Sequence, residues 1–162
     1  MPFQLSAERI VRYLETQIDI DAQPGDVWSV LVDFARYPEW NPFVLRAEGL
    51  LQEGALLDIV MRPWQQPPAP YRVRLTSIRA PHHLGWLGHF KVPGLIDGDH
   101  SFALEELPSG ATRLRQDERF GGLLVPFVWR SFIQRYLALS FEALNQNLKA
   151  RCEGRPLPVP IT

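Results

Sequence analysis

The stretch from Val125 to Lys149 constrains the fold most, because it predicts one long amphipathic helix. It has no internal glycine, and its one proline, Pro126, stands in the first turn, where a missing N–H group costs no hydrogen bond. Such a helix would be about 37 Å long and needs a long apolar partner, and the sequence before it predicts mainly strands. Apolar residues recur every three or four positions, on one face of the helix: Trp129, Phe132, Ile133, Tyr136, Leu137, Phe141, Leu144 and Leu148.

The composition is that of one globular domain over 1–162, with a core over about 15–150 and an extended, loosely held tail over 153–162. The formal net charge of −1 predicts no basic face for nucleic acid. No apolar run is long enough to cross a bilayer, so we expect no stable membrane insertion. The single cysteine, Cys152, excludes an intramolecular disulfide and favours the reducing cytoplasm as the location.

Upstream of the long helix, the pattern predicts one strand, two short helices and six further strands. In the first strand, over 12–21, polar and apolar residues alternate. Pro24 predicts the start of a short helix, and a second, turn-like helix should end by Pro42. A short helical lead-in is predicted over 6–10. The later strands are joined by short connections, which favours antiparallel pairing; they are predicted over 43–47, 56–61, 71–78, 83–90, 99–107 and 112–120.

Several short motifs follow one another in an order that resembles a known family. They are IDA at 20–22, VW at 27–28, FARYPEWNPF at 34–43, LGWLG at 84–88, GDHSF at 98–102 and ERFG at 118–121. Together they resemble the START-like helix-grip (SRPBCC) superfamily, in its polyketide cyclase/dehydrase-like branch. The resemblance implies an α+β fold, in which a curved antiparallel sheet of about seven strands wraps around a long C-terminal helix. It also implies a cavity between sheet and helix for a small hydrophobic or amphipathic molecule.

Strand parity selects candidate residues for that cavity, because alternate residues of a strand share a face. In the last strand, the apolar Leu114 and Phe120 identify the inward face, and the residues between them on that face are polar. The same rule applies to the two strands before it. The inward candidates are, strand by strand, Gln116, Glu118 and Phe120; His100 and Phe102; and Trp86 and Phe90.

Glu118 and His100 are the candidates for chemistry. A buried carboxylate is costly without a donor or water, so Glu118 is predicted to line a hydrated pocket near His100 and to orient a polar group of the ligand. A structural role, in an ion pair with an arginine, is the alternative. Histidine is the usual acid or base of proteins, so His100 is a candidate for that role, although a hydrogen-bonded core histidine is the commoner role. The other histidines show no metal-ligand spacing, so no metal or cofactor is predicted.

Tryptophans supply candidate walls, since each combines a large apolar surface with one polar group. Trp40 and Trp64 are expected in loops, and Trp86 on the inner face. Three residues of the long helix complete the predicted ligand site: Trp129, Ile133 and Tyr136. For any one tryptophan, core packing is the simpler role. The apolar run over 92–96 predicts a lip over the cavity, or a contact with a membrane or partner.

Three functions fit these observations, and the first is favoured. It is non-covalent binding of a small hydrophobic molecule, for carriage, sensing or sequestration. The second is a cyclase- or dehydratase-type enzyme that uses Glu118 and His100 as acid and base. The third is a protein-interaction module similar to the chaperone-ATPase activators, which would use the 92–96 run. The sequence leaves open the ligand, the state of the cavity, and whether the chain forms a homodimer.

Overall fold

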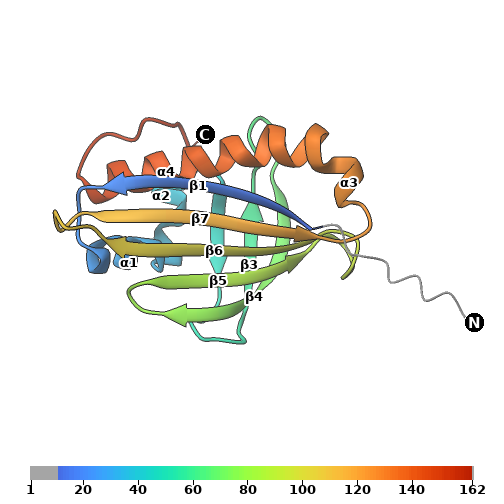
Figure 1. Cartoon of the computed structure of the whole chain (residues 1–162), viewed down its shortest axis with the longest axis horizontal. Helices are drawn as coiled ribbons and strands as arrows, with labels where there is room; N and C mark the ends of the chain where they lie inside the picture. Colours follow the sequence, from blue (N-terminus) through green and yellow to red (C-terminus); the bar gives the residue numbers. More distant parts are fainter. Residues whose placement is uncertain (1–10, 162) are drawn as a thin grey trace, which may run out of the picture.

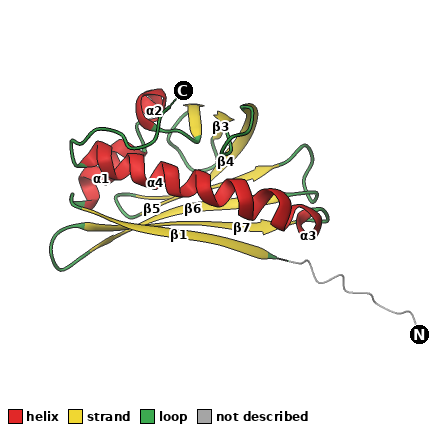
Figure 2. Cartoon of the chain, turned by 90° about the horizontal axis from the view of Figure 1, so that it is seen from above, coloured by secondary structure: helices red, strands yellow, loops and turns green. Residues whose placement is uncertain are grey.

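The computed structural model describes residues 11–161, and there one curved sheet holds the long C-terminal helix against its inner face (Figures 1 and 2). The sheet has seven antiparallel strands in the order β1-β7-β6-β5-β4-β3-β2. This arrangement confirms the predicted fold class and every predicted strand. The strands are β1 (Arg12–Ile20), β2 (Val44–Glu48), β3 (Leu56–Met61), β4 (Ala69–Arg79), β5 (His83–His89), β6 (Asp97–Glu106) and β7 (Thr112–Gly121).

Three short helical elements connect β1 to β2, as the prolines predict: α1 (Pro24–Leu31), η1 (Phe34–Arg36) and α2 (Tyr37–Trp40). Pro24 occupies the first helical position, and Asp26 lies in the first turn, where the helix dipole favours an acid. The buried Tyr37 hydroxyl donates to the Leu31 carbonyl at 2.7 Å and so links α2 to the end of α1. These elements lie at one end of the molecule (Figure 2).

The C-terminal helix is continuous, but most of its first half is π-helical. It comprises α3 (Val125–Val128), a π-helical segment η2 (Trp129–Leu137) and α4 (Ala138–Cys152). A π-helix bonds residue i to i+5, so its turn is wider than the α-helical spacing assumed from the sequence. Ile133 is buried at 2% exposure, whereas Phe132, expected on the same buried stripe, is 36% exposed. The predicted apolar stripe therefore holds in α4 but not through η2.

Buried apolar side chains form two clusters on the inner face of the sheet. The larger one surrounds α1, α2 and α4, and the smaller one joins Phe120, Val125 and Ile133 under α3 and η2. The inner face of β7 passes from Leu114, in the larger cluster, to Phe120, in the smaller one. The two residues of that face between them are polar, namely Gln116 and Glu118. The candidate site therefore lies where the clusters meet.

The C-terminal tail is docked, which corrects the expectation of a loosely held segment. The backbone N–H of Val159 donates to the Asn147 side-chain oxygen at 3.0 Å, and the Asn147 amide donates back to the Val159 carbonyl at 2.8 Å. Arg62 donates to the Ile161 carbonyl at 2.7 Å. These bonds fix the tail against α4 and the end of β3. The helix predicted over 6–10 lies outside the described residues.

Candidate functional site

His100 and Glu118 are direct cross-strand partners on β6 and β7. His100 Nδ1 lies 3.4 Å from a Glu118 carboxylate oxygen, Oε2, and His100 Nε2 lies 3.2 Å from the Gln116 amide nitrogen. Both His100 and Gln116 are buried, and the Glu118 side chain is 15% exposed. The strand parity that predicted these residues on the inner face is confirmed. Sheet register alone brings the three together.

With the Gln116 amide in its present orientation, one tautomer of His100 fits both contacts. When the Gln116 amide N–H donates to Nε2, that nitrogen accepts, and Nδ1 carries the proton that is donated to Glu118. The Gln116 carbonyl oxygen is then buried without a partner. If His100 gained a second proton at Nε2, a turned Gln116 amide would accept it with this same oxygen. The row Gln116–His100–Glu118 is thus able to hold a proton.

Aromatic rings enclose His100 on its remaining sides. The Trp86 ring is stacked on the imidazole, with centroids 5.0 Å apart and planes at 9°. Phe102 lies 4.7 Å away, and Phe141 of α4 approaches edge-on at 4.9 Å. The helix therefore closes directly over the imidazole. The open space predicted around His100 is wrong at this point, because Phe141 fills it.

Two glycines oppose each other on the inner face of the sheet beside Glu118. Gly88 of β5 pairs with Gly98 of β6, and both share strand parity with the buried Trp86 and His100. A Cβ atom on Gly98 would lie 2.2 Å from Oε1 of Glu118, so the carboxylate rests directly over the glycine. Neither glycine has a side chain, so the partly exposed Glu118 carboxylate lies directly against the strand backbone at Gly98.

The remaining predicted residues divide into two groups. Those near the site are Phe120, which is buried, and Trp129, which packs on it edge-on at 6.0 Å. Ile133 lies in the same cluster. Tyr136 is half-buried and packs against Phe132 at 5.6 Å. Phe120, Trp129 and Ile133 therefore belong to one apolar cluster.

Three predicted residues lie elsewhere, and they correct the expected site. Trp40 is the last residue of α2, is fully buried, and packs on Tyr37 at 5.2 Å, so it belongs to the core. Trp64 lines a pocket of about 360 Å³ beside α4 and the tail, where its backbone N–H donates to the Ser140 hydroxyl oxygen. Phe90 follows the end of β5, is 40% exposed, and lines a different pocket between β4 and β5.

Sequence reasoning missed the two glycines and a set of cationic residues. A glycine inside a strand indicates a close approach of another group to the backbone. Gly88 lies in the LGWLG motif and Gly98 in the GDHSF motif, so this signal is present in the sequence. Arg74 and Lys91 line the β4–β5 pocket, but periodicity carries no signal for charges that gather from separate strands and loops. The run over 92–96 is exposed at Val92 and half-buried at its end.

The described residues contain neither a metal-binding cluster nor a membrane-spanning helix. Within residues 11–161, no group of three histidine, cysteine or acidic side chains is placed to hold a metal ion. No helix of that range combines the length and the apolarity needed to cross a bilayer.

Comparisons with known proteins place this fold. A family model described as polyketide cyclase/dehydrase and lipid transport matches residues 12–153. No curated protein matches the chain. The solved Zhui aromatase/cyclase from Streptomyces sp. R1128 is similar with a TM-score of 0.74 at 16% identity, covering 89% of this chain and 94% of that one. A START superfamily protein from Mycobacterium smegmatis gives 0.69 at 18% identity, covering 88% and 97%.

A larger solved protein is also similar over one half of its length. The di-domain ARO/CYC BexL from the BE-7585A biosynthetic pathway matches with a TM-score of 0.73 at 16% identity. The match covers 90% of this chain but 51% of that protein, so the present chain spans about half of it. At these identities the likeness establishes the fold alone.

Proposed function

Since the chain belongs to the polyketide cyclase/dehydrase and lipid transport family, we propose that it binds a small amphipathic molecule between the sheet and the C-terminal helix. One observation carries the proposal. The Glu118 carboxylate is partly exposed on the inner face, above the paired glycines Gly88 and Gly98, and Trp86 and Phe120 supply apolar surface on the same face. The polar end of the ligand binds Glu118, and its apolar body lies against Trp86 and Phe120.

The hydrogen-bonding capacity of Glu118 supports this assignment. Among the described residues its partner is His100, at a long 3.4 Å, through one of two carboxylate oxygens. An ionised carboxylate accepts several hydrogen bonds, so Oε1 keeps its capacity. An acceptor in apolar surroundings favours a ligand with a hydroxyl or N–H donor, because the alternative is an unsatisfied charge.

Naphthol and naphthalene form a matched pair of probes for this site, since they differ by one hydroxyl donor. We expect the wild type to bind naphthol more tightly than naphthalene in a calorimetric or fluorescence titration. In Glu118→Gln the affinity for naphthol should fall about tenfold, because a hydrogen bond to a charged group is lost, and the affinity for naphthalene should not change. Glu15→Gln, which removes an exposed carboxylate of β1, is the control. Equal naphthol binding by Glu118→Gln and wild type would refute the proposal.

Acid–base catalysis on the bound molecule is the second candidate function. The row Gln116–His100–Glu118 favours it, because it links an imidazole to a partly exposed carboxylate. In this case Glu118 exchanges a proton with the substrate, and His100 supplies or accepts it at Nδ1. A synthetic poly-β-keto thioester is the test substrate. Catalysis predicts turnover that is lost in both Glu118→Gln and His100→Asn, with naphthol binding retained in His100→Asn; no turnover by the wild type leaves binding alone.

A further inference from the structure

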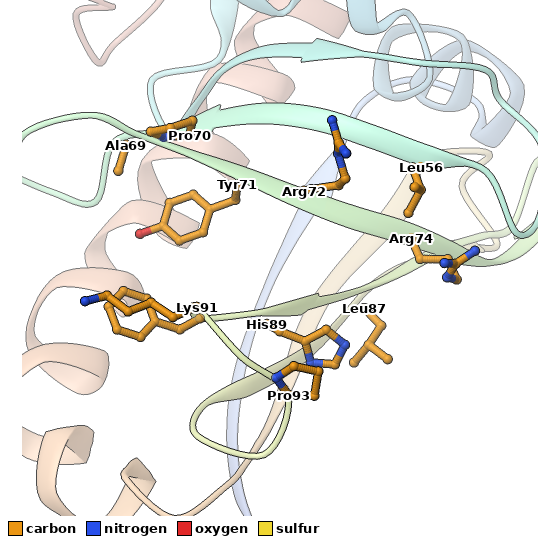
Figure 3. Close-up of a pocket in the computed structure, with 11 residues that line it drawn as sticks. Leu56, Ala69, Pro70, Tyr71, Arg72, Arg74, Leu87, His89, Lys91 and Pro93 are labelled. Atoms are coloured by element: carbon orange, nitrogen blue, oxygen red, sulfur yellow. The ribbon is translucent and has the colours of Figure 1, made fainter.

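The sheet opens between the start of β4 and the end of β5. The ladder that joins them stops at the pair Val73–Gly88. Beyond it, residues 69–72 of β4 pair only with β3, whereas β5 continues with β6 as far as the pair His89–Asp97. The opening is a pocket of about 590 Å³ (Figure 3). We call it the β4–β5 pocket.

Residues from both faces of β4 line this pocket. Tyr71 shares strand parity with the buried Val73 and so belongs to the inner face, while Arg72 and Arg74 belong to the exposed outer face. Part of the lining is apolar and comes from several segments: Leu56, Ala69, Pro70, Leu87, Phe90 and Pro93. The pocket therefore places apolar surface directly beside cationic groups.

The lining is cationic, because it includes arginine, lysine and histidine but no carboxylate. Two of these groups are already compensated: Arg72 donates to both oxygens of Asp58, at 2.6 and 3.1 Å, and His89 lies 2.7 Å from Asp97. Arg74 donates to a backbone carbonyl, that of Gly54. Within residues 11–161, neither Arg74 nor Lys91 has a carboxylate at ion-pair distance.

Lys91 is held in an unfavourable backbone conformation. Its φ is 63°, in the left-handed region that side chains other than glycine, asparagine and aspartate rarely adopt. Its ammonium lies 5.7 Å from the Phe90 ring centroid, and Figure 3 shows it on the same side of the pocket as the Tyr71 hydroxyl. Strain of this kind concentrates at functional positions. Here it presents one uncompensated cation beside a hydroxyl donor.

We propose that the β4–β5 pocket binds an amphiphilic carboxylate, with the anionic group at Lys91 and the apolar body against Leu56 and Leu87. The Tyr71 hydroxyl donates a second hydrogen bond to the carboxylate, and Arg74 adds positive potential. A singly charged group suits the site, since only two of its cations lack a carboxylate partner. This site is distinct from the site at Glu118 and does not depend on it.

Calorimetric titration with decanoate, decanol and acetate tests the site. Decanoate and decanol share one chain, and acetate is the carboxylate without it, so the series separates the anion from the apolar body. The test variant is Lys91→Asn, because asparagine tolerates the left-handed backbone. Arg130→Gln removes an exposed cation of η2 and is the charge-matched control. The thermal unfolding midpoint checks folding, and Arg74→Gln is the second variant if Lys91→Asn unfolds early.

We expect the wild type to bind decanoate more tightly than decanol or acetate. Lys91→Asn should weaken decanoate binding about tenfold, the effect of one charged hydrogen bond, and Arg130→Gln and Glu118→Gln should leave it unchanged. Naphthol binding should survive in Lys91→Asn, which separates a failure here from a failure at Glu118. Equal decanoate binding by wild type and by a folded Lys91→Asn or Arg74→Gln would overturn the proposal. Equal affinities for decanoate and decanol, or for decanoate and acetate, would do the same.

Discussion

Gly98→Ala should displace the Glu118 carboxylate and lower the stability of the protein, although alanine is ordinarily the better strand residue. The added Cβ would lie 2.2 Å from Oε1, and Cβ atoms essentially never come closer than 3.0 Å to another heavy atom. Oε1 must therefore move by about 0.8 Å. The three atoms nearest to the new Cβ all belong to Glu118, so the whole conflict is with this one side chain.

The size of the effect follows from three contributions. An off-rotamer glutamate costs about 0.5–1.5 kcal/mol, and loss of the charged hydrogen bond to His100 costs about 1.5 kcal/mol. Replacing a strand glycine by alanine recovers about 0.5–1 kcal/mol. The free energy of unfolding should therefore fall by about 1–2.5 kcal/mol in Gly98→Ala. In a Glu118→Ala background the first two costs vanish, and the same substitution should stabilise the protein by about 0.5–1 kcal/mol.

A double-mutant cycle with urea unfolding measures this reversal of sign. Gly88→Ala is the control. Its Cβ would lie 3.1 Å from Val73 Cγ1, and no atom of Glu118 lies within 4 Å of it. Its effect should be the same with and without Glu118. If Gly98→Ala has the same effect on stability in both backgrounds, the Glu118 carboxylate does not lie over Gly98.

Two further predictions concern the C-terminal helix. Burial raises the pKa of the Cys152 thiol to about 12. At pH 8 a thiol-specific disulfide reagent should therefore modify the folded protein roughly a hundredfold more slowly than the urea-unfolded chain, and comparable rates would contradict the raised pKa of this thiol. Ile133→Ala should cost about 2–4 kcal/mol of unfolding free energy and Phe132→Ala less than about 1 kcal/mol, and the reverse order in chemical denaturation would exclude the π-helical register.

The sheet was predictable because its residues obey a strict period of two. In β7 the alternation of Leu114, Gln116, Glu118 and Phe120 with charged residues fixes which face is inward, and a slip by one residue would bury arginines. Since β6 and β7 are neighbours in sequence joined by a short turn, their pairing is also fixed. The contact between His100 and Glu118 follows from this register.

Other features depend on tertiary packing, which no local pattern encodes. The π-helical segment η2 changes which residues of the helix face inward. An apolar residue every three or four positions fits both an α-helix and a π-helix. The sequence pattern therefore does not predict the exposure of Phe132. Parity places His100 on the inner face, but only the approach of α4 decides that Phe141 covers it. Trp40 was expected in a loop at the ligand site because two prolines flank it, yet it completes α2.

The difference in exposure between His100 and Glu118 assigns them different roles in either proposed function. His100 is 3% exposed and lies under Trp86, Phe102 and Phe141, so a bound molecule cannot touch its ring without moving the helix. Glu118 remains accessible at the edge of the same cluster. Glu118 is therefore the contact residue for a ligand, and His100 is a positioning residue that holds the carboxylate in place through Nδ1. His100→Asn should accordingly lower the affinity for naphthol less than Glu118→Gln does in the same titration, and an equal loss in the two variants would refute this division.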